Sequence, residues 1–132
     1  IRDSFISVGA SSIEFNENII AVFSNYGLKN VDIFAPGNSV YSLMPDNEYA
    51  YQSGTSMAAP SLTGVASMVL SYFPKLSASK LKEIILESGL DINLSVKIPG
   101  KDGETGFKSL SKTGKIVNAY NALILASKSK KK

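Results

Sequence analysis

Apolar residues occur first in short runs, and later along the chain in longer runs with helical spacing. The short runs "SFISVGA" (4–10), "IIAVFS" (19–24) and "VDIFAPG" (31–37) are rich in β-branched and aromatic residues and end at turn-forming residues. Such runs are typical of buried strands. In "VYSLMPDNEYAYQ" (40–52), two mixed runs flank the tetrapeptide PDNE. Because proline presets the backbone angle and Asp and Asn tolerate turn geometry, this pattern predicts a hairpin.

Residues 57–72 form the strongest predicted helix. Apolar side chains point in nearly every direction around it, so we expect it to be buried on most sides. Pro60 would lie in its first turn, where backbone N–H groups have no helical partner. Pro74 follows shortly after the last apolar residue and is typical of a helix that has ended.

A second helix is predicted after Ser77, which is a suitable N-cap residue. Its apolar residues Leu81, Ile84 and Ile85 fall on one face, and Gly89 is the expected stop. One face of this helix should therefore cover other elements.

Residues 91–115 contain one proline and four glycines, and we expect an irregular loop or hairpin there. Residues 117–126 then predict a third, amphipathic helix. Strands come first and helices follow, and one helix is too apolar for a surface position. This order indicates an α/β layered structure.

Composition fits a globular chain, since 44% of the 132 residues are hydrophobic and 19% are charged. The length suits one domain or a piece of a larger one. The chain begins with Ile1 rather than Met, and we interpret it as a processed or excised segment without a signal peptide. No apolar run reaches the roughly 18 residues of a membrane span.

The net charge of +3 comes from the end of the chain, where the last five residues include four lysines. The remainder has ten basic and eleven acidic residues, which predicts no nucleic-acid partner. We expect residues 127–132 to be a disordered basic tail and residues 1–126 to form the folded part.

Cysteine and histidine are both absent. The first absence excludes disulfides, thiol catalysis and thiolate metal sites. The second removes the commonest general base near neutral pH and the commonest metal ligand. No acidic cluster has calcium-loop spacing either, so no metal or other cofactor site is predicted in this chain.

Ser56 lies where an extended segment meets the first helix, in "YQSGTSMAAPSL" (51–62). One interpretation is that Thr55 or Ser56 caps the helix. The other is that Ser56 is a nucleophile, because N–H groups at a helix start can stabilise an oxyanion in acyl transfer. Gly54 would then let a substrate approach the hydroxyl. Local pattern alone leaves both interpretations open.

The segment "GTSMAAP" (54–60) resembles the nucleophile signature of the subtilases, the subtilisin-like serine peptidases. "FISVGA" (5–10), "FSNYG" (23–27), "VDIFAPG" (31–37) and "VYSLMPDNEYAYQSGTS" (40–56) resemble successive family segments in order, and "GKIVNAYNAL" (114–123) resembles the closing helix. The resemblance implies the C-terminal part of a catalytic domain. Its fold would be α/β with three layers, a mostly parallel sheet, a β-hairpin and a long buried helix.

By this resemblance the protein is a serine endopeptidase that forms an acyl-enzyme on Ser56. Thr55 and the Ser56 backbone N–H would lie on the oxyanion side. Gln52, Gly54 and Met57 would border the substrate cleft, with Gln52 and Met57 on the leaving-group side. Packing in the core is an equally open interpretation for Met57.

The resemblance begins just after the position of the family's oxyanion asparagine, so the catalytic Asp, His and Asn are missing. The five aspartates match no catalytic motif, and Ser61 stands where family members commonly have histidine. We therefore expect the fragment to be inactive alone. The alternative is a pseudopeptidase or interaction domain that retains the fold.

The resemblance also implies a protein or peptide substrate, secretion or location in the cell envelope, and structural calcium in the whole protein. Strands separated from their upstream neighbours leave unpaired edges, which favour self-association.

Overall fold

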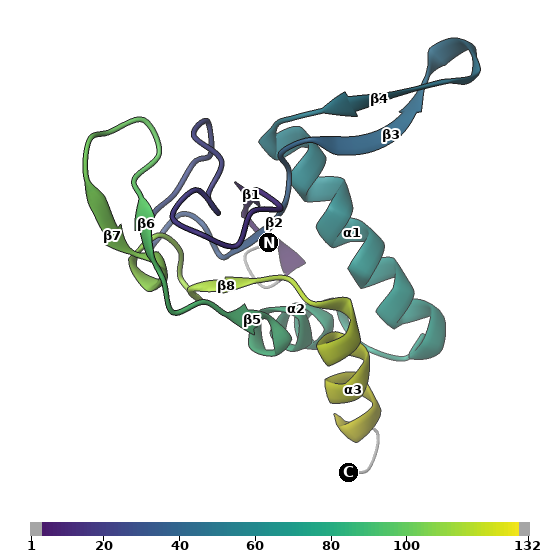
Figure 1. The fold of residues 1–132 in the computed structure, drawn as a ribbon. Helices are drawn as coiled ribbons and strands as arrows, with labels where there is room; N and C mark the ends of the chain where they lie inside the picture. The colour runs from purple at the N-terminus through teal and green to yellow at the C-terminus, as the bar shows by residue number, and fades with distance from the viewer. Residues whose placement is uncertain (1–3, 130–132) are drawn as a thin grey trace.

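The computed structural model describes residues 4–129, and a four-stranded sheet lies at its centre (Figure 1). Strand β1 (Val8–Ser11) pairs in parallel with β2 (Ile33–Pro36), and β2 pairs in parallel with β8 (Lys115–Ile116). Strand β5 (Leu90–Asp91) completes the sheet as an antiparallel edge. The predicted mostly parallel sheet of an α/β fold is confirmed.

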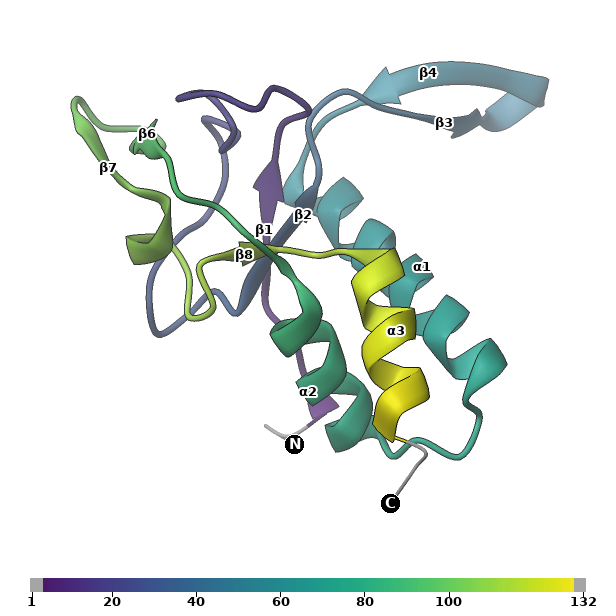
Figure 2. The same ribbon diagram turned by 60° about the horizontal axis from the view of Figure 1, so that its bottom comes forward.

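Three helices pack together on one face of this sheet (Figure 2). They are α1 (Thr55–Tyr72), α2 (Ala78–Ser88) and α3 (Ala119–Ser129). Helix α1 contacts β1 and β2 directly, whereas α3 contacts α1 and α2. The interface of sheet and helices is made of small and branched apolar side chains, namely Ala10, Ala21, Ile33, Ala35, Ala58, Leu62 and Ile85.

The opposite face of the sheet is covered by a hairpin and loops. The hairpin consists of β6 (Ser95–Lys97) and β7 (Glu104–Gly106), and a 3-10 helix η3 (Phe107–Ser109) follows it. Of the two alternatives expected for residues 91–115, an irregular loop or a hairpin, the structure has the hairpin. Val96 of the hairpin packs with Phe34 of β2, Phe107 of η3 and loop residues. Together they form a second buried cluster, namely Ile19, Ile20, Val31, Phe34, Ile92, Val96, Phe107 and Leu110.

A second hairpin projects from the body of the molecule as a separate arm (Figure 1). It is formed by β3 (Val40–Met44), the turn η2 (Pro45–Asn47) and β4 (Glu48–Gln52). Its two strands are antiparallel along their whole length. The predicted hairpin and the position of its turn are both confirmed.

The prediction of a strand over residues 19–24 is wrong. Ile20 makes one antiparallel bridge to Ser11, and the chain then turns, closed by a hydrogen bond from Ser24 N–H to the Ala21 carbonyl. The Ser24 hydroxyl accepts a hydrogen bond from Ala10 N–H at 2.8 Å. Ile19, Ile20 and Ala21 of this run are buried in the core although they form a turn. Burial of an apolar run therefore does not require that it pair as a strand.

Helix α1 differs from its prediction in two respects. It begins at Thr55, so Pro60 lies beyond the first turn. Only Ala58, Leu62 and Val69 are buried, whereas Met68 and other residues on the outer side are exposed. The prediction that α1 is buried on most sides is therefore wrong. Within residues 4–129, the sheet and the other two helices cover only one side of α1.

The ends of the other helices are largely as predicted. Ser77 caps α2 by accepting a hydrogen bond from Lys80 N–H at 3.2 Å, and Gly89 follows the last helical residue. Helix α3 extends to Ser129, so the tail predicted to be disordered from residue 127 is helical over residues 127–129. Residues 130–132 of that tail lie outside the described part.

Candidate active site

Ser56 lies at the carboxyl ends of strands β1 and β2. The chain leaves β2 at Gly37, runs through the β3–β4 arm and returns at Gly54. There Gly54 N–H donates to the Gly37 carbonyl at 2.7 Å, and Gly37 N–H donates to the Ser11 carbonyl at 3.0 Å. These two bonds fix the start of α1 to the end of the sheet. Crevices at the carboxyl ends of parallel strands are common ligand sites in α/β proteins.

Gly37 allows the close approach of these segments. A Cβ at this position would lie 2.8 Å from the Ala10 Cβ, 2.8 Å from the Gly54 carbonyl oxygen and 2.9 Å from the Ala58 Cβ. All three distances are shorter than side-chain contacts allow. Only glycine therefore brings the start of α1 this close to β1 and β2.

The capping interpretation of Thr55 and Ser56 is wrong. Gly54 is the N-cap of α1, and no side chain makes a capping hydrogen bond. Ser56 is exposed, and within residues 4–129 its hydroxyl has no hydrogen-bond partner. Met57 N–H and Ala58 N–H donate to the Gly54 carbonyl, at 3.0 and 3.3 Å. The N–H groups of Thr55 and Ser56, which precede them, have no intrahelical acceptor.

The predicted cleft residues precede and follow this serine along the chain. Met57 is half-buried, and its Sδ lies 3.5 Å from the position of a Cβ built on Gly54. Met57 belongs to none of the buried hydrophobic clusters of the described chain. Gln52 ends β4, and its Nε2 lies 3.8 Å from the Met44 Sδ, so its side chain points along the arm.

Several residues without a predicted role in the site also lie at the start of α1 and the base of the arm. The Ser61 hydroxyl lies 3.0 Å from the Pro36 carbonyl oxygen and 2.9 Å from that of Met57, and it links α1 to the end of β2. The Ser53 hydroxyl accepts from Ser39 N–H at 2.8 Å and donates to Asn38 Oδ1 at 3.0 Å. These two hydrogen bonds of Ser53 form a clamp at the base of the arm. Its signal in the sequence is the small polar residues that stand on either side of the arm.

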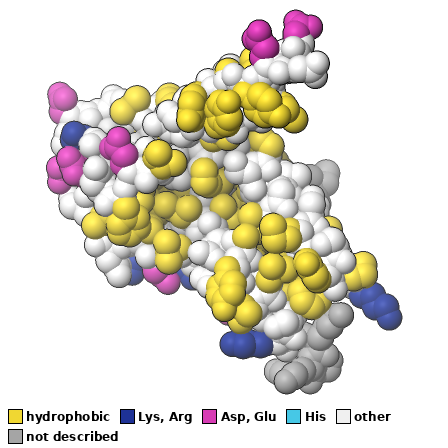
Figure 3. All heavy atoms as spheres, turned by 45° about the vertical axis from the view of Figure 1, so that its right-hand side comes forward, with side chains coloured by type: hydrophobic (Ala, Val, Ile, Leu, Met, Phe, Trp, Pro, Cys, Tyr) yellow, Lys and Arg dark blue, Asp and Glu magenta, His cyan; other side chains and the backbone are white. Residues whose placement is uncertain are grey.

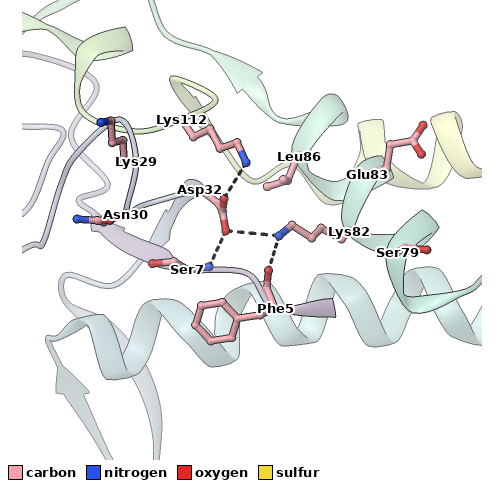
Figure 4. A pocket seen from close by; sticks show the side chains of 10 residues that line it. All are labelled: Phe5, Ser7, Lys29, Asn30, Asp32, Ser79, Lys82, Glu83, Leu86 and Lys112. Carbon is pink, nitrogen blue, oxygen red and sulfur yellow. Dashed lines mark hydrogen bonds and ion pairs between the residues drawn. The ribbon is translucent and has the colours of Figure 1, made fainter. Parts of the chain in front are cut away.

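Among residues 4–129, no basic side chain hydrogen-bonds to the Ser56 hydroxyl. Histidine is absent from the sequence. Asp32 lies at the amino end of β2, where it accepts a hydrogen bond from Ser7 N–H and pairs with Lys82 and Lys112 (Figure 4). These residues line an open cavity of about 740 Å³ that does not include Ser56.

The remaining aspartates of the described chain lie at the surface. Asp46, Asp91 and Asp102 are exposed, and Asp3 lies outside the described part of the chain. Across residues 4–129, no group of three or more acidic side chains is close enough to hold a metal ion. Over the same range, no helix is long and apolar enough to cross a membrane.

The sequence and the fold both match known proteins. The model of the subtilase family matches residues 3–115. Subtilisin DY of Bacillus licheniformis is 46% identical over 80 residues, which are 61% of this chain and 28% of that protein. The cell wall-associated protease of Bacillus subtilis is 38% identical over 88 residues, which are 67% of this chain and 9% of that protein.

Among solved structures, one described as the structural basis of subtilase cytotoxin SubAB assembly superposes with a TM-score of 0.70 at 28% identity. The match covers 93% of this chain and 37% of that one. The match to the family model extends over most of the chain, and the chain belongs to the subtilase family. It spans well under half the length of these relatives.

Proposed function

We propose that the whole protein is a subtilisin-like serine endopeptidase and that Ser56 is its nucleophile. The observation that carries this proposal is the exposed Ser56 hydroxyl, without a hydrogen-bond partner among the described residues, at the start of α1. A serine that only capped the helix would accept a bond from the first turn. Membership of the subtilase family supports the same role.

In the proposed reaction, Ser56 Oγ attacks the carbonyl carbon of the scissile peptide bond. The serine proton passes to a base and then to the leaving amine, which departs as the acyl-enzyme forms. Water then attacks the ester, releases the acid and restores the hydroxyl. The base of this family is a histidine, and none occurs in these 132 residues. The proposal therefore takes the base from another part of the whole protein.

Backbone N–H groups of Thr55 and Ser56 would face the oxygen on which negative charge develops. Their position at a helix start adds the positive end of the helix dipole. Gly54 leaves space for the substrate backbone, and Gln52 and Met57 would contact the leaving-group side. Without the base and the side-chain oxyanion donor, we expect the isolated chain to be inactive.

The proposal is tested by labelling the full-length protein with a serine-directed fluorophosphonate. Ser56→Ala should abolish labelling and lower peptide hydrolysis by at least about 10³-fold. Ser67→Ala removes an exposed serine further along the same helix and should change neither quantity. Labelling that persists in Ser56→Ala would show that another residue is the nucleophile.

The absence of histidine also favours a second candidate, a scaffold that keeps the fold without catalysis. One observation distinguishes the two candidates, namely whether the whole protein contains the histidine and the aspartate of the family outside these 132 residues. If it contains neither the histidine nor the aspartate of the family, the full-length protein should fail to label, and the scaffold function stands.

Location and assembly are also proposals. A relative described as a cell wall-associated protease supports an extracellular or envelope location and a protein or peptide substrate; calcium would be bound elsewhere in the whole protein. We expect the isolated chain to self-associate, although the outer edge of β1 is partly occupied, since Ala21 N–H donates to the Ala10 carbonyl. A monomer by light scattering at about 50 μM would contradict self-association.

A further inference from the structure

The β3–β4 arm carries an exposed aromatic face, which is formed by Tyr41, Leu43, Tyr49 and Tyr51. Tyr41 is paired with Tyr51 and Leu43 with Tyr49, so all four side chains project to the same side of the hairpin. Each of the four exposes between 58% and 70% of its surface. A contiguous apolar surface of this kind commonly marks an interaction site.

The rings of the aromatic face are already ordered against one another. The ring centroids of Tyr41 and Tyr49 are 5.6 Å apart with planes 21° from parallel, and those of Tyr41 and Tyr51 are 4.8 Å apart. Tyr41 is therefore the central ring of the three. Rings held in this way lose little conformational entropy when they bind a partner.

The arm is acidic within a chain that is basic overall. No lysine or arginine occurs between Lys29 and Lys75, whereas the turn carries Asp46 and β4 begins at Glu48, both exposed. By its pairing with Met44, Glu48 projects to the side of the hairpin opposite the aromatic face. Figure 3 shows acidic side chains at the far end of the arm and hydrophobic side chains along it. Tyrosine rings attract cations through their faces, and the carboxylates attract them over longer distances.

The arm is fixed next to Ser56. Strand β4 ends at Gln52, and helix α1 begins three residues later at Thr55. The Ser53 side chain bonds to Asn38 and to Ser39 N–H, and this clamp closes the base of the arm. Tyr51, which with its partner Tyr41 is the part of the aromatic face nearest the base of the arm, therefore lies a few residues from Ser56 along the chain, on the side of the hairpin opposite Gln52.

We propose that the aromatic face binds a lysine- or arginine-rich segment of the polypeptide substrate, outside the cleft around Ser56. The inference rests on the proposed peptidase function and adds the chemistry of a second contact. The cationic side chains of the segment lie over the tyrosine rings, and the carboxylates of Asp46 and Glu48 near the far end of the arm add a longer-range attraction.

The test compares two peptide substrates of the full-length protein. Both carry the same residues around the scissile bond, and the flanking segment contains lysines in one and glutamines in the other. Tyr41→Ala should raise KM for the lysine substrate about 10-fold, leave kcat unchanged and leave the glutamine substrate unaffected. Asp46→Asn with Glu48→Gln should raise KM about 3-fold, and salt should remove that effect. Asparagine is chosen because Asp46 has φ 62°, a conformation that it tolerates.

Matched controls come from exposed residues elsewhere on the chain. Tyr120→Ala removes an exposed tyrosine of α3, and Asp102→Asn removes an exposed carboxylate of the loop between β6 and β7. Neither should change KM for either substrate. Equal effects of Tyr41→Ala on both substrates would overturn the inference.

Two further results would also overturn it. A lower midpoint of unfolding for Tyr41→Ala without any change in KM would mean that another part of the same protein covers the aromatic face. Concentration-dependent dimerisation abolished by Tyr41→Ala would mean that a second copy covers it.

Binding of the lysine peptide to the full-length Ser56→Ala protein, measured by titration, separates the inference from the proposed function. If the parent protein cleaves neither substrate while Tyr41→Ala still weakens this binding about 10-fold, the peptidase function fails and the binding face stands. If cleavage proceeds and Tyr41→Ala leaves binding unchanged, only the inference fails.

Discussion

The two ends of the parallel strands differ in the charge of their residues and in the contacts that those residues make. At the carboxyl ends, Ser11, Pro36 and Gly37 are uncharged, and backbone hydrogen bonds hold the adjoining segments together. At the amino ends, Asp32 exposes 13% of its side chain and is paired with Lys82 and Lys112, both at 3.8 Å (Figure 4).

Under the proposed function, this difference separates stability from chemistry. The carboxylate at the amino end is fully engaged, because it accepts Ser7 N–H at 2.9 Å and faces both lysines. The carboxyl end instead holds Ser56 exposed, with no partner for its hydroxyl among the described residues. A group that is to react with a ligand cannot be consumed by internal contacts, and the fold keeps the two tasks at opposite ends of the sheet.

The largest expected effect is that of Gly37→Ala in the full-length protein. The added Cβ meets three atoms at 2.8 to 2.9 Å, one of them the Gly54 carbonyl oxygen. It should lower the free energy of unfolding by about 3 kcal/mol and reduce fluorophosphonate labelling of Ser56. Gly106→Ala is the control, because a Cβ there meets nothing within 4 Å. Wild-type labelling of Gly37→Ala would show that the approach of α1 to the sheet is not required.

Next in size is Asp32→Ala at the opposite end of the strands. Loss of the carboxylate leaves Ser7 N–H and Lys82 without this partner, at a cost of about 2 kcal/mol in the free energy of unfolding. The rate of Ser56 labelling should not change under conditions where both proteins are folded. Lys112, with 60% of its side chain exposed, offers a contrast, since Lys112→Ala should cost about 0.5 kcal/mol. A labelling rate that fell with Asp32→Ala would contradict the separation of the two ends.

The smallest expected effect is that of Ser61→Ala. The hydroxyl links α1 to the Pro36 carbonyl at 3.0 Å, and its loss should cost about 1 kcal/mol in the free energy of unfolding. Because the bond holds the helix that carries Ser56, kcat should also fall several-fold while KM stays constant. Ser61→Thr, which restores the hydroxyl, should recover kcat. An equal loss of kcat in Ser61→Thr would assign the effect to crowding rather than to the hydrogen bond.

Most of the secondary structure could be predicted because its signals are local. The turn of the arm is encoded by Pro45, Asp46 and Asn47, and the cap of α2 by Ser77. Each of these residues acts on backbone groups within a few positions of itself. The family signature around Ser56 is also local, and it was the only signal in the sequence that identified the candidate nucleophile.

Other features depended on residues distant in sequence. The run at residues 19–24 has a composition typical of a strand, yet it forms a turn. Contacts with β1 hold that turn, namely the bridge between Ile20 and Ser11 and the hydrogen bond from Ala10 N–H to the Ser24 hydroxyl. Serine is a residue type that commonly caps helices, yet the N-cap position of α1 is occupied by Gly54 and not by Ser56. Gly54 is held there because its N–H donates to the Gly37 carbonyl.

The sequence by itself determined most of the elements of this protein, the family to which it belongs and the absence of histidine from these 132 residues. Only the tertiary structure decided that Gly37 must be a glycine, that Asp32 is held by two lysines and that three tyrosines share one exposed face. The physical reason is range. Turn and cap preferences act over a few residues, whereas steric contact, ion pairing and burial are fixed only when distant segments meet.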